Sequence, residues 1–228
     1  DTHLLKINYN QNVLCPDGLK RKAQKQKEED INAYNHIWLG ECRSANDVVI
    51  YSGKWEILDY KVDIDLDIQS LTFEGHSKRV RYGIDIGGTS PTAVIELFTH
   101  GNCIYIHNEI YKTDMSAEDT TAEMLRVMPL CMSPIAKITG DNNNVAFLNG
   151  MKRNRVVDGV EYPALNIKTA QKGQGSVLLG IKYIRSFKRI YVHPRCKNMI
   201  MELKHYSYKV HSKTGEVIRD NIVKKYDH

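Results

Sequence analysis

The chain has 228 residues, of which 42% are hydrophobic and 26% are charged, and its formal net charge is +5 at pH 7. This composition is typical of a globular protein with a buried core, and it excludes global disorder. No stretch approaches the roughly eighteen consecutive apolar residues of a transmembrane helix, so we expect no membrane partner. The five cysteines form no C-x-x-C pair, which favours free thiols over disulfides or a zinc site.

The two ends of the sequence predict a fragment of a longer protein. The chain begins at Asp1 rather than at a Met, no signal-peptide pattern follows, and it stops at His228.

The charge is distributed unevenly along the chain. Residues 1–141 hold 15 Lys and Arg against 21 Asp and Glu, a balance of −6, whereas residues 142–226 hold 17 against 5, a balance of +12. The basic second part predicts a polyanionic partner, DNA or RNA first. A solvated basic face without a partner is the alternative.

The N-terminal part is predicted to be helical and then extended. Residues 17–39 carry an apolar stripe beside a Lys-, Gln- and Glu-rich face and end at a glycine, which indicates a helix. Residues 63–67 alternate Asp with Ile and Leu, which predicts an exposed ribbon or a linker. We place a domain boundary near residue 75, so that residues 1–74 precede a domain of residues 75–228.

Strands and helices alternate from residue 79 onward. The predicted strands cover residues 80–85, 92–97, 103–110, 135–139, 165–169 and 189–192. The predicted helices cover residues 116–130, 144–153, 176–187 and 198–206, and residues 206–210 form one arm of a hairpin. Three antiparallel strands followed by strand–helix alternation is the order of an RNase H-like fold of the ribonuclease H/integrase superfamily. We therefore expect an α/β domain with a mixed sheet flanked by helices, preceded by a helical and linker extension.

Asp85 ends an otherwise apolar predicted strand, directly before Ile86-Gly87-Gly88. A carboxylate in a buried strand is unfavourable unless a cation or hydrogen-bond donors compensate for its desolvation. We interpret Asp85 as a ligand of a divalent metal ion. A capping or turn role beside the two glycines is the alternative.

Asp141 follows the predicted strand 135–139, at the strand end where ligands collect in open α/β sheets. Its alternative role is the N-cap of the helix 144–153. If its strand neighbours that of Asp85, the two carboxylates face each other across one sheet edge and repel unless Mg²⁺ or Mn²⁺ lies between them. Two such ions would activate water and stabilise the leaving oxygen of a scissile phosphate.

Basic residues follow this acidic pair. Lys172 opens a glycine-containing loop whose backbone N–H groups can approach a phosphate, although the loop does not match a Walker A pattern. Lys182 and Arg185 belong to a basic run interleaved with aromatic residues, which suits a groove that follows a nucleic-acid backbone without reading bases. A plain flexible connection is the alternative for the Lys172 loop.

Glu109 is a third acid in the predicted sheet. It lies on the face opposite to Ile104 and Ile106, so we expect it to be exposed to solvent. The histidines lack H-E-x-x-H spacing and are expected at surface or packing positions.

Several segments, in their order along the chain, resemble the large terminase subunit of tailed bacteriophages, specifically its C-terminal nuclease domain. They are Trp38-Leu39-Gly40-Glu41, the Y-G-x-D-x-G and P-T-A-x-V block at Tyr82–Val94, the strand-end Asp141, the K-G-x-G-S segment at Lys172–Ile181 and E-L-x-x-Y at Glu202–Tyr206. The resemblance covers nearly the whole chain, and its specificity lies in the ordered combination.

The resemblance implies an RNase H-like endonuclease that cuts concatemeric phage DNA during packaging, with Asp85 and Asp141 as ligands of Mg²⁺ or Mn²⁺. It also implies that a motor ATPase precedes residue 1 and that residues 1–74 are its trailing part and a linker. The implied partners are double-stranded DNA, the terminase small subunit, the portal or procapsid and the ATPase domain of the same subunit, in the host cytoplasm.

The closing motif of the family, D-H-A-x-D, is interrupted here after Asp227-His228. The third catalytic Asp of the family is therefore expected beyond residue 228. Asp227 would border the site, and His228 would be a metal-proximal or proton-handling group. A chain that ends at His228 is expected to cleave poorly.

Three other readings share parts of this pattern. Asp85-Ile86-Gly87-Gly88-Thr89 resembles the phosphate-binding D-x-G-G-T loop of actin-like sugar kinases, and Gly140–Ala146 faintly resembles their catalytic-base segment. The missing second glycine-rich nucleotide loop and the basic second part argue against a kinase. A resolvase-like nuclease would share the metal chemistry, and a non-catalytic DNA-binding module would share only the charge.

Overall fold

The computed structural model describes residues 8–29, 31–40, 48–211 and 217–223. The described residues form two compact units, one of those before Lys54 together with those from Leu203 onward, and one of Lys54–Glu202. Asp227 and His228 lie outside the described residues. Within the described ranges, no helix is long and apolar enough to cross a membrane.

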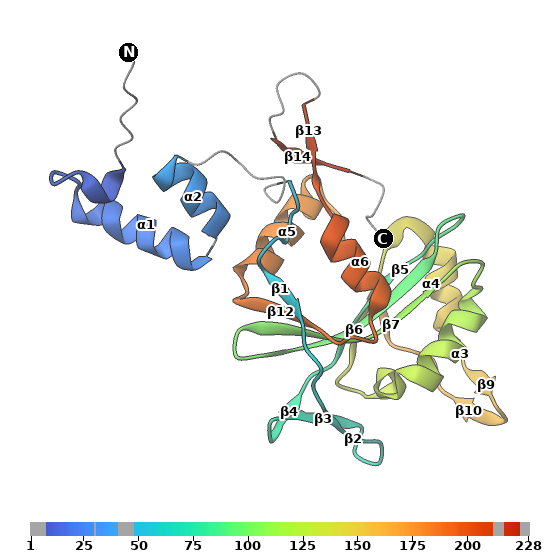
Figure 1. Ribbon diagram of the computed structural model, residues 1–228. Helices are drawn as coiled ribbons and strands as arrows, with labels where there is room; N and C mark the ends of the chain where they lie inside the picture. The colour runs from blue at the N-terminus through green and yellow to red at the C-terminus, as the bar shows by residue number, and fades with distance from the viewer. Residues whose placement is uncertain (1–7, 30, 41–47, 212–216, 224–228) are drawn as a thin grey trace. The chain divides into compact units, whose positions relative to one another are not determined.

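The larger unit is built on a seven-stranded mixed sheet (Figure 1). In spatial order its strands are β1 (Trp55–Ile57), β12 (Arg189–Val192), β7 (Cys103–Lys112), β6 (Thr92–His100), β5 (Arg81–Asp85), β8 (Lys137–Gly140) and β11 (Ile167–Thr169). The successive strands β5, β6 and β7 pair antiparallel, and all the other neighbours pair parallel. The predicted mixed sheet and its order of strands along the chain are confirmed.

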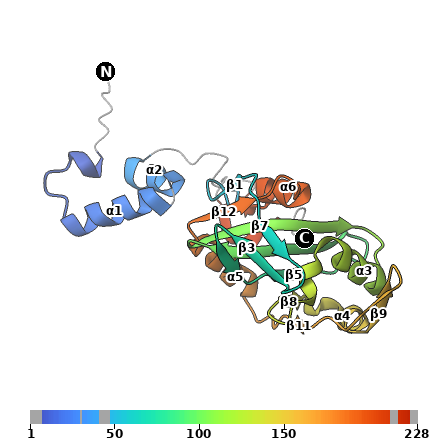
Figure 2. The same ribbon diagram turned by 90° about the horizontal axis from the view of Figure 1, so that it is seen from below.

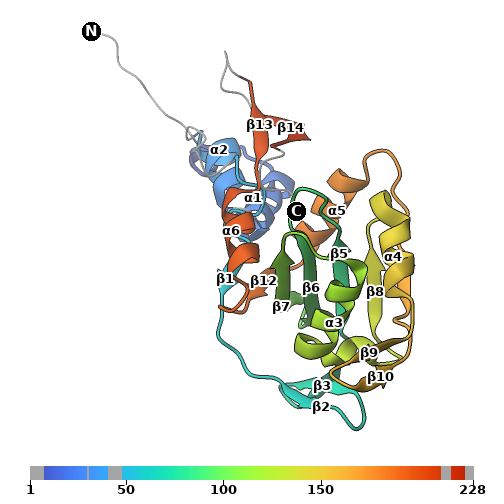
Figure 3. The same cartoon turned by 90° about the vertical axis from the view of Figure 1, so that its right-hand side faces the viewer.

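Helices flank this sheet. They are α3 (Ala117–Val127), α4 (Val145–Met151), α5 (Ser176–Ser186) and α6 (Lys197–His205), with 3₁₀ turns at Pro129–Met132 and Asn142–Asn144. Helices α3 and α4 lie side by side (Figures 2 and 3), and they approach so closely that a Cβ at Gly150 would lie 2.8 Å from the Cβ of Ala117. Their buried side chains form one core with the sheet residues Tyr82 and Ile84.

A buried carboxylate lies in the middle of this core. Glu96 is 1% exposed and pairs across the sheet with Tyr82 on one side and Asn108 on the other. The Tyr82 hydroxyl donates to Glu96 Oε1 (2.8 Å), and Asn108 Nδ2 donates to Oε2 (2.5 Å). Burial raises the pKa of the Glu96 carboxyl, and these two hydrogen bonds oppose the rise. Both partners are therefore needed to offset the desolvation of an acid in the core.

The expectation that Glu109 is solvent-exposed is wrong. Its side chain is half-buried and accepts hydrogen bonds from the backbone N–H groups of Asn198 and Met199, both at 2.8 Å. These donors belong to the first turn of α6, whose N–H groups have no partner within the helix. A carboxylate there also interacts favourably with the helix dipole. Glu109 thus fixes the N-terminus of α6 to strand β7 of the sheet.

The acidic ribbon is confirmed as an exposed element. Strands β2 (Asp63–Asp65), β3 (Ser70–Phe73) and β4 (His76–Lys78) form a small antiparallel sheet, and all of β2 is exposed. Leu71 and Phe73 of β3 are buried in the main core. Because β4 leads into the start of β5, the ribbon lies at the end of the main sheet opposite to Asp85 (Figures 1 and 3).

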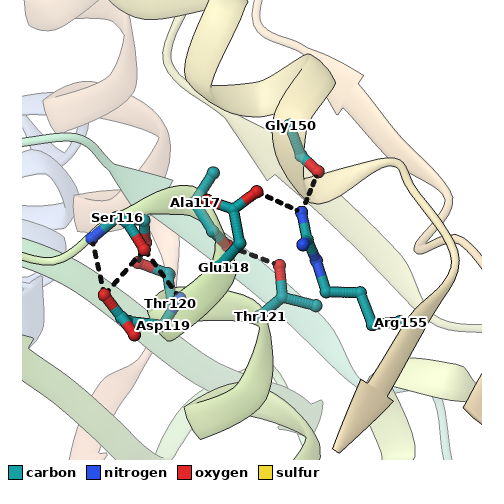
Figure 4. Close-up of polar contacts among 8 residues, drawn as sticks. All are labelled: Ser116, Ala117, Glu118, Asp119, Thr120, Thr121, Gly150 and Arg155. Carbon is teal, nitrogen blue, oxygen red and sulfur yellow. Dashed lines mark hydrogen bonds and ion pairs between the residues drawn. The ribbon is translucent and has the colours of Figure 1, made fainter.

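A second hairpin was not predicted. Strands β9 (Arg155–Val157) and β10 (Val160–Tyr162) pair antiparallel. The Arg155 guanidinium bonds the Gly150 carbonyl of α4 and the Glu118 carboxylate of α3, the latter at 3.0 Å (Figure 4). The same figure shows the capping box of α3, in which Ser116 and Asp119 bond each other's backbone N–H groups.

The smaller unit holds α1 (Asp17–Glu29), α2 (Ile31–Leu39), a 3₁₀ turn at Tyr9–Gln11 and the hairpin of β13 (Tyr208–Val210) and β14 (Val217–Ile222). The segment predicted as one helix is therefore described as two. The predicted hairpin arm corresponds to β13. Tyr51 stacks on Tyr206 with ring centroids 6.0 Å apart, which ties the start of this hairpin to the segment after α2.

The buried cysteines carry free thiols, as expected. Cys15, Cys103, Cys131 and Cys196 are all buried and unpaired, whereas Cys42 lies outside the described residues. Burial raises the pKa of Cys131 and of Cys196 to about 12. These two thiols are therefore protonated and act as packing groups.

Replacing Tyr82 by Phe tests the role of the buried carboxylate. Tyr82→Phe removes one of the two donors to Glu96, and we expect the free energy of unfolding in urea to fall by about 1–3 kcal/mol. The control is Tyr162→Phe, at a half-buried tyrosine against the same core, with an expected change below about 0.5 kcal/mol. Equal losses in the two variants would show that loss of a tyrosine hydroxyl in this core, and not loss of the bond to Glu96 in particular, carries the effect.

Candidate active site

Three neighbouring parallel strands end at one edge of the sheet, and each delivers a charged residue there. Ile84 of β5 is in register with Gly140 of β8, and Gly140 with Thr169 of β11. Asp85 therefore ends its strand beside Asp141, as predicted for neighbouring strands. Lys172 follows shortly after the end of β11. The carboxyl ends of adjacent parallel strands are a common ligand-binding edge in α/β sheets.

Backbone hydrogen bonds fix the position of Asp141 at this edge. The Asp141 N–H donates to the Ile84 carbonyl of β5 (2.9 Å), and the Ala170 N–H donates to the Gly140 carbonyl (2.8 Å). Asp141 is thus held on one side by β5 and on the other by the segment after β11. Its place relative to Asp85 depends on the sheet ladder and not on a mobile loop.

The two carboxylate oxygens of Asp141 have different surroundings. Oδ2 accepts from Lys172 Nζ (2.6 Å) and from Asn143 Nδ2 (2.8 Å). Oδ1 is buried and has no hydrogen-bond partner among the described residues. Since Asp141 as a whole is only 9% exposed, an oxygen in this position is unfavourable unless a further group binds it.

The alternative role of Asp141, as the cap of the following helix, is wrong. Its side chain makes no capping hydrogen bond. Asn144 is the N-cap of α4 instead, because its side-chain oxygen accepts from the Phe147 N–H (3.0 Å). The helix terminus therefore does not use the carboxylate of Asp141.

Asp85 is the half-buried last residue of β5, on the face opposite to the buried Tyr82 and Ile84. The chain turns sharply after it. A Cβ on Gly87 would lie 1.9 Å from the Ser90 carbonyl oxygen, a distance no side chain can accommodate, whereas a Cβ on Gly88 would meet nothing within 4 Å. Only the first glycine of the pair is therefore required by close packing of the turn.

The residues at this edge fit a hard divalent cation. Mg²⁺ and Mn²⁺ prefer carboxylate oxygens, and Mg²⁺ is often held by one or two carboxylates together with substrate phosphates. Asp85 and Asp141 supply two carboxylates, and Asp141 Oδ1 is a buried acceptor that the described residues leave unsatisfied. Within the described ranges no group of three His, Cys, Asp or Glu side chains could hold a metal ion. Asp227 and His228, which were predicted to border this site, lie outside the described residues.

The basic residues of the second part of the chain differ in their surroundings. Lys182 and Arg185 lie on α5, with Lys182 exposed and Arg185 half-buried. Tyr183, between them, is 66% exposed. Arg195, by contrast, donates to His193 Nδ1 (2.9 Å) and to Asn108 Oδ1 (3.2 Å), so it belongs to the polar network around Glu96. The candidate nucleic-acid surface is thus narrower than the basic run of the sequence.

Two contacts of the site were not predicted from the sequence. Lys172 was predicted to lie in a phosphate-binding loop, and no role was predicted for Asn143. In the structure both donate to Asp141 Oδ2. A weak signal was present for Asn143, which is an amide two residues after a strand-end carboxylate and can reach back to that side chain. No signal was present for Lys172, because the pairing of β11 with β8 cannot be read from local pattern.

The two glycines after Asp85 provide a matched test of the turn. Gly87→Ala forces a methyl group against the Ser90 and Pro91 backbone, and we expect the free energy of unfolding to fall by about 1–3 kcal/mol. Gly88→Ala enters open space and should change stability by less than about 0.5 kcal/mol. Chemical denaturation of both variants measures the difference. Equal stability of the two would contradict the close packing of the turn.

Comparisons with known proteins agree with this architecture. The family model described as "Terminase RNAseH like domain" matches residues 88–228, more than half of the chain. The match begins just after Asp85. The PBSX phage terminase large subunit of Bacillus subtilis (strain 168) is 25% identical over 224 residues, covering 96% of this chain and 47% of that protein. The chain therefore spans about half the length of this curated relative.

Two solved structures share the fold. The nuclease domain of the large terminase g2p from bacteriophage SPP1, crystallised with bound Mn, has a TM-score of 0.59 and 22% identity over 79% of this chain and 92% of that chain. The large terminase of a thermophilic bacteriophage, in complex with ADP, has a TM-score of 0.58 and 15% identity, covering 98% of this chain and 52% of that chain. The predicted RNase H-like fold is confirmed. The chain belongs to the terminase RNase H-like domain family.

Proposed function

We propose that this chain is the nuclease part of a terminase large subunit, and that it cuts concatemeric viral DNA during genome packaging in a reaction that requires Mg²⁺ or Mn²⁺. The observation that carries the proposal is the pair of strand-end carboxylates, Asp85 and Asp141, with a buried and unsatisfied oxygen on Asp141. Family membership supports the reaction class, and the Mn in the SPP1 nuclease domain supports the choice of ion.

Asp85 and Asp141 are the residues that would hold the ions. Divalent cations at this edge would supply the positive charge that makes an attacking water more acidic and stabilises the leaving oxygen of a phosphodiester. The protein contributes rigidity, because Asp85 ends one strand and Asp141 follows another, and the two strands pair directly with each other. The residues proposed to contact the DNA backbone are Lys172, Lys182 and Arg185. Binding to the phosphates requires positive charge and does not require contacts to the bases.

The remaining features extend the same proposal. The third carboxylate ligand would follow residue 228, with Asp227 bordering the site and His228 near the metal or handling a proton. Residues 1–74 would be the trailing part and linker of the ATPase domain, and residues 75–228 the nuclease domain. The proposed partners are double-stranded DNA, the small subunit, the portal or procapsid and the ATPase domain, in the host cytoplasm. Family membership removes the support that the D-x-G-G-T pattern lent to a sugar kinase.

The carboxylates are tested by neutral replacements. In a chain that continues past His228, Asp85→Asn and Asp141→Asn should each lower Mn²⁺-dependent nicking of a plasmid by at least about 100-fold, because each variant loses an anionic metal ligand. Asp63→Asn, on the exposed strand β2, is the control with the same change of charge. Cleavage that persists in both site variants would show that the site is elsewhere.

The DNA surface is tested by reversing charges on α5. Lys182→Glu and Arg185→Glu should weaken binding of a non-cleavable duplex, and each should reduce the slope of log affinity against log salt by about one. The matched control is Lys61→Glu, at an exposed lysine near the acidic ribbon, which should leave the slope unchanged. If all three variants bind alike at low salt, α5 does not contact DNA.

A further inference from the structure

Only one of the two oxygens of the Asp141 carboxylate accepts hydrogen bonds from the described residues. Lys172 Nζ and Asn143 Nδ2 both donate to Oδ2, at 2.6 and 2.8 Å, while Oδ1 is buried without a partner among the described residues. The two donors come from different elements. Asn143 lies in the 3₁₀ turn directly after Asp141, and Lys172 lies in the loop after β11.

We propose that Lys172 and Asn143 are positioning residues that fix Oδ2 and thereby present Oδ1 to the divalent cation. The inference rests on the proposed metal-dependent function and assigns Lys172 a role in addition to the proposed contact with DNA phosphate. It also identifies Oδ1 as the ligand atom of Asp141.

The physical basis is the rotation of the carboxylate. The χ2 torsion of an Asp side chain is broad, so an unrestrained carboxylate exchanges its two oxygens readily. Two donors that converge on one oxygen from different elements make one orientation strongly preferred. A charge-assisted bond from an ammonium is the stronger of the two, and it also offsets the desolvation of a carboxylate that is only 9% exposed.

The burial of the two partners shows that the pair is more than a surface ion pair. The side chain of Lys172 is 44% exposed, whereas that of Asp141 is 9% exposed. The ammonium thus reaches inward from a solvated loop to a fixed anion. Because β11 pairs directly with β8, the base of that loop is anchored beside the strand that carries Asp141.

Lys172 could instead simply occupy the place of the cation in the absence of metal. Its removal would then tighten metal binding, whereas a positioning role predicts weaker binding. Loss of a positive charge near a divalent cation would also tighten metal binding. Weaker binding after Lys172→Gln therefore has to come from lost orientation. Asn143→Ala isolates the same orientation effect without any change of charge, at an exposed residue whose loss should not affect folding.

The experiment measures Mn²⁺ affinity by isothermal titration calorimetry in a chain that continues past His228. Outer-shell partners of metal ligands contribute about 10–100-fold in affinity, so we expect Asn143→Ala and Lys172→Gln each to weaken Mn²⁺ binding about 10-fold. Lys168→Gln is the matched control, since Lys168 is an exposed lysine of β11 and should bind Mn²⁺ like the wild type. Cooperative unfolding in EDTA verifies that each variant is folded.

Each outcome bears on a different claim. If Asn143→Ala binds Mn²⁺ as tightly as the wild type does, or if Lys172→Gln binds it more tightly, the positioning role is overturned. The proposed metal-dependent function would then remain intact. Failure of the wild type itself to bind Mn²⁺ would overturn the proposed function and this inference together.

Discussion

The hydrogen-bonded pairing of β5 with β8 is the constraint on which the rest of the site depends. It brings Asp85 and Asp141, which are far apart in the sequence, to adjacent positions at one sheet edge. The ladder continues past the strands, since the Asp141 N–H still donates to Ile84. A ladder of this kind tolerates little movement, so two like charges stay close together at a cost in electrostatic repulsion. The ammonium of Lys172 binds one of these carboxylates, and the proposed divalent cations would offset the remaining repulsion.

The core beneath this edge depends on the close packing of α4 against β8. A Cβ at Gly140 would lie 2.4 Å from a methyl group of Leu148, a residue fully buried on α4. The residue before Asp141 therefore has to be a glycine for α4 to pack against β8. Helix packing and site geometry are thus coupled, because the same few residues determine how closely α4 approaches the sheet and where the carboxylate emerges. The acids Glu96 and Glu109 contribute differently, since one satisfies polar groups inside the core and the other fixes α6.

Prediction from sequence succeeded where local pattern carries the information, and it failed where packing decides. Strand alternation placed Glu109 opposite to Ile104 and Ile106, but the register between β6 and β7 shifts between Glu96 and Leu97, so that Glu109 lies on the same face as these two residues. Local pattern also could not show that the first turn of α6 donates to Glu109, so the predicted exposure was wrong. The helix-cap alternative for Asp141 is locally reasonable, yet Asn144 provides the cap. The β9–β10 hairpin was missed because its strands are short, and contacts of Arg155 to α3 and α4 secure it. In each case the deciding partner is distant in the sequence or competes with an equally suitable neighbour.

The sequence by itself determined the order of strands and helices, the uneven charge and the two strand-end carboxylates, since each follows from periodicity or composition over a short window. Only the tertiary structure decided what surrounds those carboxylates. Lys172 lies 31 residues after Asp141, and its contact with Oδ2 exists because β11 pairs with β8 in one particular register. The difference between the two oxygens of Asp141 has the same origin. It depends on donors from two elements meeting at one atom, a convergence that only the assembled sheet can produce.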